Sequence, residues 1–189
     1  MARITAILML AALLAFPASS FAVTPWGAVY EVARDERSLS DITADKNITT
    51  GIKTTLVNKD GKLGLAVKPY CFLGRVTLLG QLSDEGFKSF AVATAKKTKG
   101  VKSVTTYWEA PGKEGTATAD LEIAAKLRTT LVGDKELSST QVETEVFGGK
   151  VYLLGMVRTQ KDADRAMGHA RATKGVTGVT SLLIVSKKK

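Results

Sequence analysis

The chain has 189 residues, with 27 basic and 18 acidic side chains and a net charge of +9. This excess of positive charge suits contact with anionic lipid headgroups, polyanionic glycans or acidic protein surfaces. The chain holds one cysteine and one histidine, Cys71 and His169. A single cysteine excludes an internal disulfide, and a single histidine excludes an ordinary transition-metal site.

The first residues predict a secretory signal peptide over residues 1–22. Arg3 supplies a positive charge, residues 4–16 form an apolar run, and Ser20-Phe21-Ala22 places small residues where a signal peptidase cleaves. A retained membrane anchor is the alternative, but the run is shorter than the roughly 20 residues that cross a bilayer. Val23 stands where a bacterial lipoprotein carries its cysteine. We therefore expect an exported, soluble protein that is not a lipoprotein.

The rest of the chain repeats itself at an offset of 75 positions, as from Asp45 to Asp120 (120 − 45). A period of this length exceeds that of solenoid repeats and fits two tandem domains. The matched positions include Ile48 and Ile123, Leu56 and Leu131, Gly80 and Gly155, Gly100 and Gly175, and Val104 and Val179. The expected segments are an N-terminal extension at 23–44, a first domain at 45–107, a linker at 108–119, a second domain at 120–186 and a basic tail at 187–189.

Each copy is expected to open with an amphipathic helix, because apolar residues recur there at i, i+4 and i+8. These residues are Ile48, Ile52 and Leu56 in the first copy, and Ile123, Leu127 and Leu131 in the second. Asp45 and Asp120 precede the two stripes, where a carboxylate can accept hydrogen bonds from free amides and favour the helix dipole. We interpret both aspartates as helix caps, not as catalytic groups.

A β-hairpin follows the opening helix in each copy. Gly148-Gly149, and Gly74 in the first copy, supply the positive φ angles of a tight turn between two runs of β-branched and aliphatic residues. Pro69 lacks an amide donor, so its strand is expected at the edge of a sheet.

A second helix, poor in bulky residues, and a last strand complete each copy. Lys99-Gly100-Val101 and Lys174-Gly175-Val176 end the helix with a basic residue and a glycine before the strand. The predicted fold class is therefore α+β. Two tandem αββαβ domains are expected, each a three-stranded mixed sheet packed against two helices.

The repeated layout resembles the BON domain. The resemblance is carried by an Asp-led helix, a hairpin ending in Gly-(Lys or Arg)-Val-x-Leu-x-Gly, and a later Gly-Val-x-x-Val, each present twice. It covers residues 45–107 and 120–186. Together with the preceding segment at 33–38, the whole chain resembles the dual-BON periplasmic proteins, which include outer-membrane lipid-associated and osmotically induced members. The resemblance implies a periplasmic, non-enzymatic protein that binds phospholipid or supports envelope integrity under stress.

The candidate lipid contact lies on the first helix of the second copy, at Leu121, Lys126 and Arg128. The two cations attract anionic headgroups, and the leucine lies beside the helix start. Glu122 opposes deep insertion, so the membrane contact is expected to be peripheral and reversible. A solvated helix face without a ligand is the alternative interpretation.

Three further residues carry expectations of their own. Cys71 is interpreted as a buried, inert thiol, with an intermolecular disulfide as the alternative. Trp108 lies where the first domain meets the linker and is expected to seal the interface between the domains. Trp26 is expected to pack onto the first domain.

No catalytic constellation is present in the sequence. His169 has no cysteine near it and is replaced by Thr94 in the first copy. No nucleophile elbow, Walker-type loop or dinucleotide fingerprint occurs either. We therefore expect no enzymatic activity, no cofactor and no metal.

Two classes of function remain. The first is a module that binds anionic phospholipid surfaces in a salt-sensitive manner. The second is a soluble periplasmic stress protein or chaperone-like adaptor, whose sheet faces and edge strands bind other envelope proteins. Nucleic acid is not an expected partner, because export separates the protein from it.

Overall fold

A computed structural model describes residues 37–113, 115–137 and 142–186. The predicted signal peptide, Trp26, most of the N-terminal extension and the basic tail lie outside the described residues. The first copy contains α2 (Leu39–Lys59), α3 (Gly61–Ala66), β1 (Val67–Phe72), β2 (Arg75–Gln81), α4 (Glu85–Lys97) and β3 (Ser103–Glu109). The second contains α5 (Thr116–Gly133), β4 (Val142–Phe147), β5 (Lys150–Val157), α6 (Gln160–Ala172) and β6 (Gly178–Val185). Over these residues, no helix combines the length and the apolar character needed to span a bilayer.

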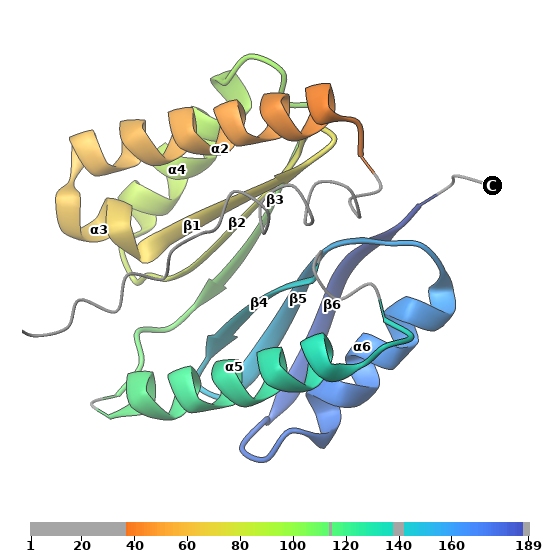
Figure 1. The fold of residues 1–189 in the computed structure, drawn as a ribbon. Helices are drawn as coiled ribbons and strands as arrows, with labels where there is room; N and C mark the ends of the chain where they lie inside the picture. The colour runs from red at the N-terminus through yellow and green to blue at the C-terminus, as the bar shows by residue number, and fades with distance from the viewer. Residues whose placement is uncertain (1–36, 114, 138–141, 187–189) are drawn as a thin grey trace, which may run out of the picture.

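Each copy forms one three-stranded mixed sheet, in the order β1-β2-β3 and β4-β5-β6. The first two strands of each sheet pair antiparallel, and the third pairs parallel with the central strand. The two sheets face one another across the middle of the molecule, and the helices lie on the outer sides (Figure 1). The predicted fold class is confirmed. The edge position of the strand that carries Pro69 is confirmed as well.

The opening helices begin earlier than the sequence pattern predicts. α2 starts at Leu39, where the Ser38 side chain accepts a hydrogen bond from the backbone N–H of Asp41 at 3.1 Å. α5 starts at Thr116, after Gly115 in a left-handed conformation. The first copy also has a helix that was not predicted, α3, whose first turn is capped by Asp60.

The interpretation of Asp45 and Asp120 as helix caps is wrong, because both lie inside their helices and are buried. Asp45 accepts hydrogen bonds from the backbone N–H groups of Leu73 (2.8 Å) and Gly74 (2.9 Å). Asp120 accepts the equivalent bonds from Gly148 and Gly149, both at 2.8 Å. Each carboxylate therefore fixes the tight turn of its hairpin to the N-terminal part of the opening helix.

The turn in the first copy needs this support, because Leu73 adopts a φ of 55°. A left-handed conformation is unfavourable for a residue with a β-carbon. Burial alone would raise the pKa of Asp45, but the bonds from Gly74, Cys71, Leu73 and Arg37 outweigh it and lower the pKa. The carboxylate is therefore ionised at neutral pH and holds the strained turn in place.

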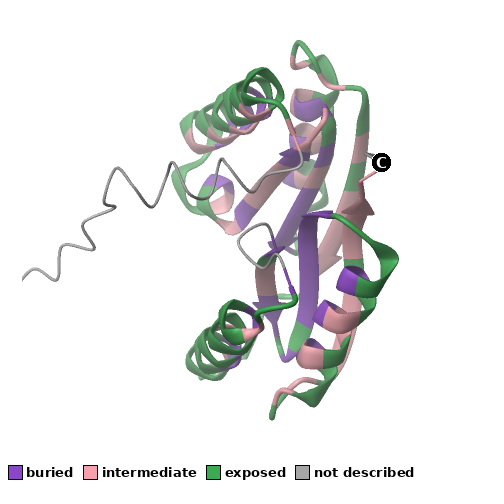
Figure 2. Cartoon of the chain, turned by 45° about the vertical axis from the view of Figure 1, so that its right-hand side comes forward, coloured by how far each residue is buried: buried purple, intermediate pink, exposed green. Residues whose placement is uncertain are grey.

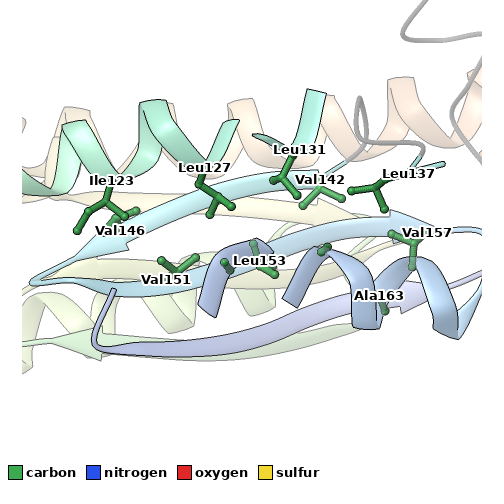
Figure 3. Close-up of a cluster of buried hydrophobic side chains, with 12 residues drawn as sticks. Ile123, Leu127, Leu131, Leu137, Val142, Val146, Val151, Leu153, Val157 and Ala163 are labelled. Atoms are coloured by element: carbon green, nitrogen blue, oxygen red, sulfur yellow. The ribbon is translucent and has the colours of Figure 1, made fainter. Parts of the chain in front are cut away.

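Each domain has its own hydrophobic core between its helices and the helix-facing side of its sheet. Purple, buried positions follow the central strands and the inner sides of the helices, while the outer helix faces are green and exposed (Figure 2). In the second domain the predicted stripe Ile123, Leu127 and Leu131 packs onto Val146, Val151 and Leu153 (Figure 3). The matching stripe Ile48, Ile52 and Leu56 fills the core of the first domain.

The two domains contact one another through the opposite faces of their sheets. A third cluster of buried or partly buried residues joins them: Leu79, Phe147, Tyr152, Leu154, Tyr70, Phe72, Tyr107 and Leu182. Leu79 and Leu154 are equivalent positions of the repeat, as are Phe72 and Phe147. Each domain thus covers its partner with the same part of its fold.

Trp108 does not seal this interface, contrary to the prediction. Side chains alternate along a strand, so Trp108 points to the helix side of β3 and packs against the first core. The ring packs beside Gly80, because a β-carbon at that position would lie 3.4 Å from a ring atom of Trp108. The neighbouring Tyr107 and Glu109 point the other way and reach the second domain.

Two glutamates hold the domain interface from opposite sides. Glu145 on β4 accepts hydrogen bonds from Lys68 (2.5 Å) and from the hydroxyl of Tyr70. Glu109 on β3 accepts them from Lys150 (2.8 Å) and from the hydroxyl of Tyr152. Glu109 belongs to the first domain and Glu145 to the second. Each domain therefore supplies both hydrogen-bond donors and an acceptor to the interface.

We expect the domain contact at Glu109 to weaken in acid. The hydrogen bonds from Lys150 and Tyr152 lower the pKa of Glu109 below its ordinary value of 4.5. A carboxyl whose pKa is depressed on folding contributes stability above its unfolded pKa, and this is lost as the pH falls through the folded pKa. Urea titrations of the natural protein and Glu109→Gln should therefore differ most above pH 4.5 and converge in stronger acid. A difference that grows on acidification would contradict this assignment.

Cys71 is free and buried, as predicted, and its thiol donates to Asp45 at 3.1 Å. Burial, followed by the bond to the Asp45 carboxylate, raises the pKa of Cys71 to about 12. Because the thiolate is the reactive species, iodoacetamide should modify the folded protein at pH 7.5 at a rate limited by unfolding. Mass spectrometry across a urea series tests this. Rapid and complete modification of the folded chain would show that the thiol is accessible.

Candidate functional site: the exposed face of α5

The opening helix of the second domain has one buried side and one free side. Asp120, Ile123, Leu127 and Leu131 face the sheet and are buried. The opposite side carries two strongly exposed apolar residues, Leu121 at 70% and Val132 at 61%. They are two of the four large apolar residues that are strongly exposed in the described part of the chain, the others being Leu39 and Leu65.

Leu121 and Arg128 lie on the same flank of α5. Successive helical residues are rotated by about 100°, so positions 121, 125, 128 and 132 follow one line along the helix. We call Leu121, Ala125, Arg128 and Val132 the α5 stripe. All four side chains are exposed. The stripe therefore places one guanidinium between two apolar side chains over three turns of helix.

Lys126 does not join the α5 stripe. It lies five residues after Leu121, about 140° around the helix, and its side chain forms a 3.4 Å ion pair with Glu122. Lys126 instead lines a groove of about 440 Å³ together with Ile123, Gly149 and Lys174. The structure thus brings together Leu121 and Arg128 and leaves the third predicted residue on the other flank.

The sequence prediction missed Val132 and Ala125. The signal was available, since Leu121, Ala125, Arg128 and Val132 follow the 4-3-4 spacing of one helix face. The buried stripe of α5 follows the same rule and dominates the pattern, so a second apolar line on the same helix is easily overlooked.

The first domain does not reproduce the α5 stripe. The equivalent positions on α2 are Lys46, Thr50, Lys53 and Val57, without an exposed leucine. Lys53 has a structural task, because its ammonium donates to the carbonyls of Gly64 (2.9 Å), Leu65 (3.0 Å) and Val67 (2.6 Å). These bonds close the end of α3. Burial, with repulsion from Lys68, lowers the pKa of Lys53.

A second polar cluster lies where α5 ends and α6 passes it. Asp134 accepts hydrogen bonds from Arg165 at 2.5 Å and is 2.6 Å from Nε2 of His169. These two partners hold the pKa of Asp134 well below its usual range. The nearby hydroxyl of Thr130 donates to the carbonyl of Lys126 at 3.0 Å. The cluster therefore ties α5 to α6.

Within the part of the chain that the structure describes, no group of three or more His, Cys, Asp or Glu side chains is arranged to hold a metal ion. The α5 stripe and the flanking groove remain the surfaces on which the predicted lipid residues lie.

Comparison with known proteins finds relatives that are similar to this chain over most of its length. It is 30% identical over 139 residues to osmotically-inducible protein Y of Escherichia coli K12, covering 71% of this chain and 69% of that protein. It is 29% identical over 163 residues to outer membrane lipoprotein DolP of Haemophilus influenzae, covering 84% of this chain and 83% of the relative. Neither relative is named for a catalytic activity.

A solved structure of CdsD, a structural protein of the Chlamydia trachomatis type III secretion system, is more distant. It is 15% identical, covers 76% of this chain and 65% of its own, and has a TM-score of 0.29. The BON domain family matches this chain twice, over residues 44–107 and 119–187, which together make up most of its length. The chain therefore belongs to the BON domain family and contains two BON domains in tandem.

Proposed function

We propose that this protein is an exported, non-enzymatic binding protein that associates with anionic phospholipid surfaces through the α5 stripe. The observation that carries the proposal is the exposure of Leu121 and Val132 on either side of Arg128. Exposed apolar side chains next to a cation suit a shallow contact with anionic headgroups. The similarity to an outer membrane lipoprotein and to an osmotically inducible protein supports a role in envelope integrity under stress.

The proposed contact is weak and reversible. Burial of a leucine or valine side chain contributes about 1.5–3 kcal/mol at most, and a basic residue near an anionic surface about 1 kcal/mol. Glu122 lies next to the stripe and opposes deeper entry. The protein would therefore act in the periplasm as a peripheral binder, held at the membrane by headgroup charge.

Vesicle cosedimentation tests the proposal with single substitutions. The protein should sediment with phosphatidylglycerol vesicles, and less so at higher salt, because the Debye length shortens from about 10 Å at 0.1 M to about 3 Å at 1 M. Phosphatidylcholine vesicles should bind little. Leu121→Glu and Arg128→Glu should each weaken binding about tenfold, since each replaces an attractive contact by a repelled charge.

Matched variants distinguish the stripe from the other flank of the helix and from net charge. Lys126→Glu changes the charge by the same amount as Arg128→Glu but lies off the stripe, so it should weaken binding less than threefold. Lys46→Glu, at the position in α2 equivalent to Leu121, should behave in the same way. Equal losses in Arg128→Glu, Lys126→Glu and Lys46→Glu, which change the net charge by the same amount, would mean that total charge, not the α5 stripe, governs binding.

A further inference from the structure

We propose that the outer edge of β3 and the groove beside it form a docking site for an extended, acidic segment of a partner protein. This site is separate from the α5 stripe, because it belongs to the first domain. β3 is the last strand of the order β1-β2-β3. An edge strand presents backbone N–H and C=O groups that can pair with an added strand.

A groove of about 450 Å³ runs beside this edge, between β3 and α4. Trp108 lines it from β3, and Lys88, Val92, Ala93 and Lys96 line it from α4. The groove thus combines an aromatic surface with two ammonium groups, next to backbone that can form a β-ladder.

The charges at the groove select an acidic partner. Lys88 pairs with Glu85 at 2.7 Å, whereas Lys96 forms no ion pair with any residue that the structure describes. Lys97, Lys99 and Lys102 follow in the chain and are exposed. Among the described residues, Glu85 is the one acidic side chain that lines the groove.

The alternation of side chains defines what the added strand would carry. Successive residues of a strand point to opposite faces, so every second side chain of the segment would enter the groove. One apolar side chain would lie on Trp108, and carboxylates two residues before or after it would reach Lys96 and Lys88. We therefore infer a segment with an Asp-x-Leu-x-Asp type of pattern.

The second domain lacks this combination. Leu183 stands at the position of Trp108, Ala163 at that of Lys88 and Arg171 at that of Lys96. β6 is also an edge strand. A comparison of the two domains therefore distinguishes the effect of the groove from the effect of a strand edge alone. Arg171 supplies a matched control, because it is an exposed cation at the same place in the repeat.

The test uses a fluorescein-labelled eight-residue peptide. Threonine occupies every second position, and the positions between are Asp, Leu, Asp and Asp in that order. Fluorescence anisotropy with the full chain should show saturable binding, and Lys96→Glu should weaken it at least fivefold. Arg171→Glu should change it less than twofold. Hydrogen exchange should show that the peptide protects amides of β3 and leaves those of β6 unchanged. A peptide with N-methylated alternate amides should not bind, because it cannot complete the ladder.

Several results would overturn the proposal. One is no saturation up to about 1 mM peptide, which corresponds to a binding free energy weaker than about 4 kcal/mol. Equal binding of a peptide with lysine in place of aspartate would refute the charge preference. If the peptide fails to bind while Lys96→Glu weakens phosphatidylglycerol binding, the groove is a lipid contact and not a peptide site. The α5 variants Leu121→Glu and Arg128→Glu should leave peptide binding unchanged. The peptide measurement therefore tests the β3 groove independently of the lipid proposal.

Discussion

Asp120→Ala should lower the free energy of unfolding by about 3 kcal/mol, measured by urea titration followed by circular dichroism. The substitution removes the buried acceptor of two backbone N–H groups, those of Gly148 and Gly149. Loss of the partner of a buried donor costs about 1–3 kcal/mol for each group, and bonds to a charged group lie at the upper end. The hairpin of the second domain would also lose its tie to α5.

Two further variants separate this role from a general effect of charge. Asp120→Asn keeps one acceptor oxygen, so its loss should be intermediate. Asp164→Ala removes an exposed carboxylate of α6 and should change the stability by less than about 0.5 kcal/mol. If Asp120→Ala and Asp164→Ala have equal effects, the hydrogen bonds to the turn do not stabilise the domain.

Leu154→Ala should destabilise both domains, although it lies in the second. Leu154 is 1% exposed and packs in the cluster that joins the two sheet faces. Truncation of a buried leucine costs about 2–5 kcal/mol, through lost transfer free energy and the cavity that remains. Because the lining of this cavity includes Leu79 and Tyr107 from the first domain, hydrogen exchange of amides in β2 and β3 should become faster.

The control for this effect is a truncation in the core of the second domain. Leu153 is as buried as Leu154 but faces the helices, so Leu153→Ala should accelerate exchange mainly in its own domain. Unchanged exchange in the first domain of Leu154→Ala would mean that the domains do not support one another.

The elements of each domain follow from the sequence because their signals are local. Apolar stripes such as Ile123-Leu127-Leu131 mark the buried side of a helix, and the glycines at 148 and 149 mark a turn. The repeat then confirms each assignment with a second example. Helix starts were less accurate, because α2 and α5 continue for several residues on the N-terminal side of their buried stripes.

The structural role of Asp45 and Asp120 could not be predicted from local sequence signals. A carboxylate before an apolar stripe satisfies the local rule for a cap. The amides that bond to Asp45 lie 28 and 29 residues further along the chain, and only the folded hairpin brings them close. The misplacement of Trp108 has a different origin, since the alternation of β3 already puts Trp108 and Tyr107 on opposite faces.

The three residues predicted to contact lipid do not share one face of α5. Leu121 and Arg128 share one flank of α5, whereas Lys126 lies on the other and pairs with Glu122. Charge and position in the chain favour this helix as the candidate contact. The choice of flank depended on which side of α5 the sheet covers, and that is set by tertiary packing.

The most direct test of the membrane contact is a fluorescent probe on the α5 stripe itself. Cys71 is buried, so Ala125→Cys can be labelled selectively with bimane, and Thr50→Cys places the same probe at the equivalent position of α2. With phosphatidylglycerol vesicles, the probe at 125 should shift its emission to the blue and be quenched by brominated lipid, while the probe at 50 should not change. Quenching at neither position, or equally at both, would contradict a membrane contact through α5.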